Sequence, residues 1–158
     1  MTWLLDTTQG QALLTLLVAM VPVVELRGAI PFGVALGLPI PMAVTASIIG
    51  NLIPTPFIII FIRRIFYFLR RINRKLNALV TKLEDRGHLK GESVQRLGMV
   101  GLCILVAIPL PGTGAWTGSL VAALLDLRLK KAMPAIIIGV CIAAVIVTTI
   151  TYGVTEIL

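Results

Sequence analysis

The hydrophobic residues of the chain are gathered in four apolar regions of unequal length. Two of these regions are long and uncharged, residues 41–62 and 132–152. Because about 20 apolar residues in a helix span the hydrocarbon core of a bilayer, each region predicts one transmembrane helix. Pro54 and Pro56 predict a bend in the first helix, near its C-terminal end.

The other two apolar regions are too short to cross a bilayer. Residues 11–24 and 98–108 each run into a turn rich in Gly and Pro, and a short apolar return follows each turn, at 34–38 and 119–125. Irregular backbone inside a bilayer is tolerated only where protein or water satisfies its polar groups. The pattern therefore predicts two re-entrant helical hairpins.

The order of these elements predicts an internal repeat. A hairpin followed by a transmembrane helix occurs in residues 11–62 and again in residues 97–152, on either side of a basic segment at 63–96. We therefore expect an all-α integral membrane protein, a single membrane domain over residues 1–158 that is built as an inverted repeat. Transporters built in this way bind substrate near the midplane, where interrupted helices of the two repeats meet.

Composition and charge agree with a membrane protein. Hydrophobic residues make up 58% of the 158 residues and charged residues 13%, which is far from a soluble domain. The net charge of +7 lies entirely in residues 63–96, which hold ten Lys or Arg and three Asp or Glu. Because basic loops stay in the cytoplasm, this segment is expected to be cytoplasmic and both termini to face the opposite side. No nucleic-acid partner is expected.

The basic segment also predicts an amphipathic helix. Its apolar residues alternate at steps of four and three, which is one helical stripe. Such a helix lies on an anionic leaflet, continues the preceding transmembrane helix, or pairs with a second subunit. The stripe consists of Ile65, Leu69, Ile72, Leu76, Leu79 and Leu83.

Two opposite charges interrupt the first hairpin, in the stretch VPVVELRGAIPFG at residues 21–33. A charge near the bilayer centre costs about 2.5–3.5 kcal/mol, so it needs a partner or a water-lined cavity. In one interpretation, Glu25 and Arg27 lie at the membrane surface or form a buried ion pair that only fixes the hairpin. In the other, Arg27 binds an anionic group while Glu25 loads and releases a proton. Gly28 and Pro31 complete this half of the predicted site.

The second hairpin turn has no charge and offers hydrogen-bond donors. Glycines in the stretch PLPGTGAWTG, residues 109–118, can aim backbone N–H groups and the start of the return helix at an anion. Threonine hydroxyls add donors, and Trp116 lines an apolar wall or anchors at an interface. This half of the predicted site consists of Pro111, Gly112, Thr113, Gly114, Trp116 and Thr117. No set of catalytic or metal-binding side chains gathers in the apolar regions, so we expect neither an enzyme nor a cofactor.

Three stretches carry a resemblance to a known family: ELRGAIPFGVALGLP, GNLIPTPF and IPLPGTGAWTGSLVAALL. Over nearly the whole chain the sequence resembles the small multidrug export proteins of bacteria and archaea. That family is in turn distantly similar to the DedA/VTT superfamily, whose members carry two re-entrant hairpins as inverted repeats and are linked to moving lipids, including undecaprenyl phosphate. The sequence departs from the DedA pattern in the second hairpin, where Pro111 and Gly112 stand and no arginine does.

The resemblance implies a transporter or scramblase of an anionic lipid or polyprenyl phosphate in the inner membrane of a prokaryote. It implies that Glu25 and Arg27 are the acidic and basic residues of the first hairpin. An exporter of lipophilic cations is the alternative, but it needs an exposed carboxylate, and Arg27 is close enough in sequence to neutralise Glu25. The short helices and bent hairpins leave polar backbone groups that must be shielded from lipid. Because a second subunit can shield them, a homo-oligomer is also expected.

Overall fold

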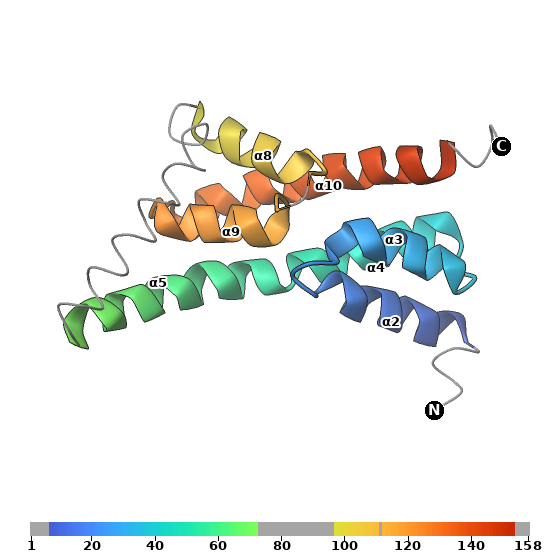
Figure 1. Ribbon diagram of the computed structural model, residues 1–158, viewed down its shortest axis with the longest axis horizontal. Helices are drawn as coiled ribbons and strands as arrows, with labels where there is room; N and C mark the ends of the chain where they lie inside the picture. Colours follow the sequence, from blue (N-terminus) through green and yellow to red (C-terminus); the bar gives the residue numbers. More distant parts are fainter. Residues whose placement is uncertain (1–6, 73–96, 111, 154–158) are drawn as a thin grey trace.

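The computed structural model describes residues 7–72, 97–110 and 112–153, and this part of the chain is helical without strands (Figure 1). The prediction of an all-α protein is therefore confirmed. In chain order the helices are α2 (Thr8–Ala19), α3 (Glu25–Ala35), α4 (Ile40–Leu52), α5 (Pro54–Ile72), α8 (Met99–Ala107), α9 (Ala115–Leu124) and α10 (Leu129–Gly153).

Two helical segments are long and apolar enough to cross a membrane, Ile40–Ile62 and Leu129–Gly153. They correspond to the two predicted transmembrane helices. The first is interrupted between α4 and α5, directly before Pro54, where the two prolines predict a bend. Pro54 and Pro56 have no N–H with which to continue the hydrogen bonds of α4. Helix α5 then continues to Ile72, so the start of the predicted basic helix extends this segment; its residues 73–96 lie outside the described residues.

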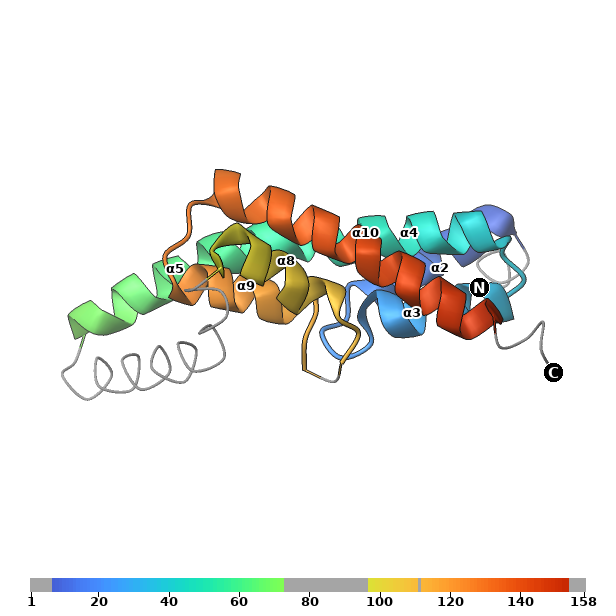
Figure 2. The same ribbon diagram turned by 90° about the horizontal axis from the view of Figure 1, so that it is seen from above.

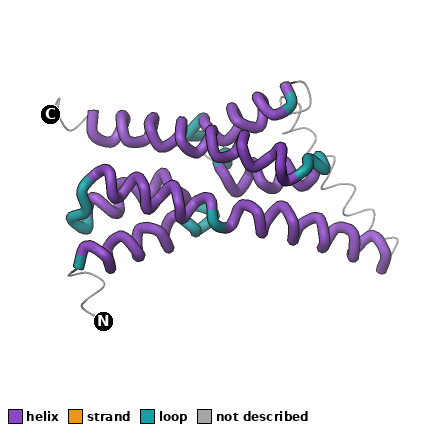
Figure 3. Tube along the Cα trace, turned by 180° about the vertical axis from the view of Figure 1, so that it is seen from behind, coloured by secondary structure: helices purple, strands orange, loops and turns teal. Residues whose placement is uncertain are grey.

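The remaining helices form two antiparallel hairpins, α2–α3 and α8–α9, which approach from opposite ends of the molecule (Figures 1 and 2). Figure 3 shows the turns of both hairpins and the α4–α5 break together, midway along the long axis. The return helices are longer than predicted and begin at Glu25 and Ala115. That the hairpins stop inside a bilayer, and that the repeats are inverted, stays a prediction.

Small residues allow the helices to pack closely. A side chain at Gly50 of α4 would collide with the Leu16 carbonyl of α2, and one at Gly139 of α10 would lie 2.8 Å from the Cys103 carbonyl of α8. The small residues of α10 face the interior, since Ala135, Gly139, Ala143 and Ala144 are all buried. This is the packing expected of helices in lipid, where close backbone approach replaces the hydrophobic effect.

The outer surface is apolar, as a lipid-facing surface must be. Phe57, Phe61 and Val145 expose 68%, 66% and 66% of their surface. Large exposed apolar areas of this kind are rare in soluble monomers. The two spanning segments therefore belong to a membrane protein.

Candidate functional site

Arg27 ties the first hairpin to the turn of the second. Its Nη2 donates to the carbonyl oxygen of Ile108 at 3.2 Å and to the Thr113 hydroxyl at 2.9 Å, and its Nη1 donates to the carbonyl oxygen of Leu110. A guanidinium has five N–H donors in a rigid fork, which suits several oxygens at once. These bonds, together with those of Glu25 below, are called the interhairpin contact.

Thr113 shapes the turn that receives Arg27. Its hydroxyl lies 2.7 Å from the Ile108 carbonyl oxygen and 2.8 Å from that of Leu110, and it accepts the Leu110 N–H at 3.2 Å. The hydroxyl thus brings the carbonyl oxygens of Ile108 and Leu110 together. As a result, this turn presents acceptors to a cation.

Glu25 binds the second hairpin at a different place, the start of α9. Its carboxylate is buried, with 4% of the residue exposed, and Oε1 accepts the backbone N–H of Trp116 at 3.1 Å. The first N–H groups of a helix have no intrahelical acceptors and carry the positive end of the helix dipole, so they favour an anion. The sequence predicts an anion at this helix terminus, and Glu25 itself fills that place.

Gly114 makes this approach possible. Its φ is +124°, and a Cβ built there would collide with the Glu25 carboxylate. Glu25 also has an unusual backbone, with φ +49°. A left-handed conformation costs a non-glycine residue about 1–2 kcal/mol, and it persists where the surrounding contacts fix it. The backbone on both sides is therefore adapted to this one contact.

Glu25 and Arg27 form no ion pair with each other within the described part of the chain, although only one residue separates them in sequence. The ion-pair interpretation of the sequence is therefore wrong in its geometry. Each charge is instead compensated by backbone groups of the opposite hairpin, 83 residues away for Arg27 and Leu110 and 91 for Glu25 and Trp116.

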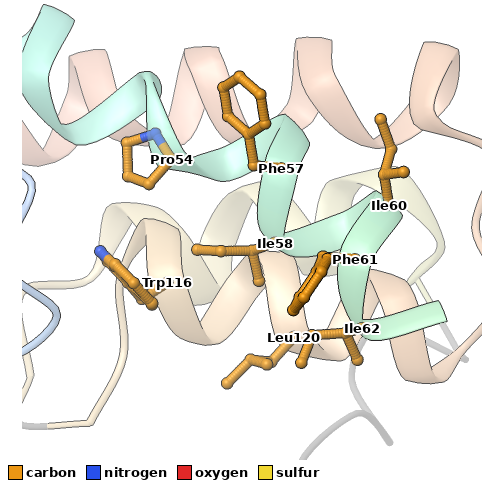
Figure 4. Close-up of a pocket in the computed structure, with 8 residues that line it drawn as sticks. All are labelled: Pro54, Phe57, Ile58, Ile60, Phe61, Ile62, Trp116 and Leu120. Atoms are coloured by element: carbon orange, nitrogen blue, oxygen red, sulfur yellow. The ribbon is translucent and has the colours of Figure 1, made fainter. Parts of the chain in front are cut away.

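Trp116 joins this polar contact to an apolar groove. Its indole Nε1 donates to the Met20 carbonyl oxygen at 3.2 Å, which fixes the ring. One side of the ring faces a groove of about 490 Å³ between α5 and α9 (Figure 4). The groove is lined by Pro54, Phe57, Ile58, Ile60, Phe61, Ile62, Trp116 and Leu120. Trp116 thus occupies an apolar wall, one of its two predicted positions.

The other predicted site residues lie around this contact without hydrogen bonding to its charges. Gly112 is exposed in the turn with φ +80°, Gly28 and Pro31 lie further along α3, and Thr117 is in the first turn of α9. Pro111 lies outside the described residues.

Sequence reasoning missed the backbone acceptors of the site, the carbonyl groups of Ile108, Leu110 and Met20. A signal for the first two exists in the sequence. Pro109 and Pro111 have no N–H, so the turn is rich in acceptors and poor in donors, which suits a guanidinium partner.

Residues 25–146 match the family model described as "Putative small multi-drug export protein". The chain belongs to this family. The match begins at Glu25 and includes both halves of the interhairpin contact, so the contact is part of what the family model covers. Neither a curated protein nor a solved structure matches the chain. The family's name indicates membrane transport, in agreement with the two spanning segments.

Proposed function

We propose that this family member transports an anionic lipid, such as a polyprenyl phosphate, and that Glu25 couples transport to a proton. The observation that carries the proposal is the bond from the Trp116 N–H to the Glu25 carboxylate at the start of α9. Carboxylate and phosphate oxygens are alternative acceptors for the same N–H groups. A helix terminus that holds a carboxylate therefore suits an anionic head group once that carboxylate leaves.

Protonation supplies the way for Glu25 to leave. A proton that binds the carboxylate makes it a neutral acid and a weaker acceptor, so the Trp116 N–H becomes available to a phosphate oxygen. Arg27, which is half-buried and bonded to neutral oxygens, gains a charged partner in the same step. Loss of the proton returns the carboxylate to α9 and expels the head group, so lipid and proton are bound and released together.

The apolar groove supplies a place for the lipid chain. Trp116 presents its backbone N–H to Glu25 and its ring to the groove, so head group and chain would lie on adjoining sides of one residue. The groove's aromatic and branched aliphatic lining suits a prenyl or acyl chain.

Export of lipophilic cations is the second candidate. The family's name favours it, as does an aromatic groove next to a carboxylate that has no ion-pair partner in the described residues. A cation would then pair with Glu25. We rank it second because Glu25 is only 4% exposed and already satisfied by a backbone N–H.

Purified protein in vesicles tests the proposal. Native mass spectrometry measures binding of a polyprenyl phosphate, and a fluorescent analogue measures its movement with and without a proton gradient. We expect Arg27→Ala to lose binding, and Glu25→Gln to keep binding but lose the response to the gradient. Lys130→Gln removes an exposed charge at the start of α10, which takes no part in the interhairpin contact, and serves as the control.

Thermal unfolding of each variant separates loss of function from loss of fold. If folded Arg27→Ala and Glu25→Gln both bind and move the lipid like the wild type, the proposal is refuted. Saturable binding of tetraphenylphosphonium that Glu25→Gln abolishes would establish the second candidate in its place.

We also propose the setting of this activity: a prokaryotic inner membrane, with residues 63–96 in the cytoplasm, and a homo-oligomer. The support is the sidedness of basic residues in membrane proteins and the exposed apolar surface of α5. A purely monomeric mass in lipid nanodiscs, with full transport, would exclude the oligomer.

A further inference from the structure

Two polar side chains of α4 are completely buried and have no hydrogen-bond partner in the described part of the chain. Ser47 and Asn51 have 0% exposure and lie one helical turn apart, on the same face. Among the described residues, no group bonds to Ser47 Oγ or to Oδ1 or Nδ2 of Asn51. Thr55, one turn further on, is also buried, but its hydroxyl donates to the Asn51 carbonyl oxygen at 3.2 Å. Buried polar groups in proteins are nearly always hydrogen-bonded to protein or to water, so this pair needs an explanation.

The backbone next to this pair is also short of donors. Pro54 and Pro56 have no N–H, so the carbonyl groups of Gly50 and Leu52 lose the donors that a continuous helix would give them. These two carbonyl groups flank Asn51 in sequence. The α4–α5 break therefore removes two regular helical donors where the side chains already lack partners.

The pair lies at the depth of the interhairpin contact. Helices α3 and α4 are antiparallel and meet where Gly33 faces Ala43, with 3.1 Å from a Cβ built on Gly33 to the Cβ of Ala43. Eight residues further along each helix, in opposite chain directions, come Glu25 and Asn51. Because both helices rise by the same distance per residue, these two residues are at the same level. Figure 3 likewise shows the α4–α5 break midway along the molecule, with the hairpin turns.

We propose that Ser47 and Asn51 hold at least one ordered water molecule inside the first repeat. Water both donates and accepts, so one molecule can accept from Asn51 Nδ2 and donate to Oδ1 or to a freed carbonyl oxygen. A bare metal cation would serve the oxygens but leave the amide hydrogens unpaired. The water site would explain why the stretch GNLIPTPF, residues 50–57, contains polar groups that take no part in the interhairpin contact.

The water site is independent of the proposed transport function, because its evidence is burial and hydrogen bonding in α4. It adds a hydrated group in the protein interior at the level of Glu25.

Replacing Asn51 by leucine, which has a similar shape, tests the site, because the direction in which the melting temperature changes depends on whether water is bound. If the amide is dry and unpaired, Asn51→Leu removes a penalty and raises the melting temperature in lipid nanodiscs. If it holds water, Asn51→Leu expels that water and leaves Ser47 and the carbonyl groups unpaired, and we expect the melting temperature to fall by about 2–4 °C. Thr55→Val is the matched control, since it removes one buried hydroxyl whose bond to the Asn51 carbonyl oxygen across the α4–α5 break is already made, and it should have a smaller effect.

A second measurement applies even if Asn51→Leu fails to fold. In the wild-type protein labelled with ¹⁵N at asparagine, NMR should detect magnetisation transfer from water to the Asn51 side-chain amide. Absence of that transfer, or a higher melting temperature for Asn51→Leu, would overturn the proposal. A wild-type melting temperature that rises with NaCl, but not with choline chloride at equal ionic strength, would indicate a bound cation and also overturn it.

Discussion

Replacing Gly114 by alanine should break the contact between Glu25 of the first hairpin and the start of α9 in the second. Gly114 has φ +124° and ψ −169°, a region that is essentially restricted to glycine, and an added Cβ would occupy the position of the Glu25 carboxylate. The substitution therefore strains the backbone and pushes Glu25 away from the Trp116 N–H.

The expected cost has two parts. Holding a side-chain-bearing residue in such a backbone region costs about 1–3 kcal/mol. Losing a hydrogen bond to a charged group costs about 1.5–3 kcal/mol more. Together they predict that Gly114→Ala lowers the free energy of unfolding by about 2.5–6 kcal/mol.

Gly112 provides the matched control. It also has a positive φ, +80°, but a Cβ built there has nothing within 4 Å. Gly112→Ala should therefore cost only the backbone strain, about 1–2 kcal/mol. Unfolding in mixed detergent and denaturing detergent, followed by tryptophan fluorescence, measures both variants.

A double-mutant cycle isolates the collision. Truncating Glu25 to alanine removes the carboxylate, so adding Gly114→Ala to Glu25→Ala should cost only the backbone strain of Gly114, about 1–3 kcal/mol. If Gly114→Ala costs the same with and without the carboxylate, the close approach of Glu25 to Gly114 is not what fixes this glycine, and the reasoning fails.

Two further predictions concern Arg27 and the topology. Arg27→Lys keeps the positive charge, but an ammonium group lacks the forked donors that bond to three oxygens. The substitution should therefore lower the free energy of unfolding by about 1–3 kcal/mol in the same assay. A free energy of unfolding equal to that of the wild type would show that the charge alone suffices. For the topology, the basic stretch 127–131 is expected in the cytoplasm and the N-terminus on the opposite side. In a variant without the two native cysteines, a single cysteine at exposed Thr8 and one at exposed Lys130 should therefore react with a membrane-impermeant maleimide from opposite sides. Labelling of both from one side would contradict the inverted repeat.

The sequence predicts the spans and hairpins of this fold because each depends on a count of consecutive apolar residues. The bounds of the return helices are harder to predict. Charges, glycine and proline at Glu25 to Pro31 resemble a turn, yet these residues form the first two turns of α3. Pro31 is tolerated there because its missing N–H deprives only the Arg27 carbonyl, four residues earlier, of a helical donor.

The site could be predicted in its residue types but not in its pairing. Glu25 and Arg27 stand out as charges in an apolar region, whereas their partners are backbone groups, which have no letter in the sequence. The burial of Ser47 and Asn51 could not be predicted either. An uncharged apolar region predicts a transmembrane helix whether or not it contains a serine and an asparagine. Only the packing of α4 against α2 and α3 reveals that they are buried.

The separation of the interhairpin contact along the chain has a consequence for biosynthesis. Glu25 and Arg27 leave the ribosome 83 to 91 residues before the groups that compensate them. At about 5–20 residues per second, the delay is roughly 4–18 s. During that time, Glu25 and Arg27 lack the backbone partners of the second hairpin, and each charge would cost about 2.5–3.5 kcal/mol at the bilayer centre, the depth that the sequence predicts for this hairpin. We therefore expect the first hairpin to enter the bilayer together with α9 rather than before it.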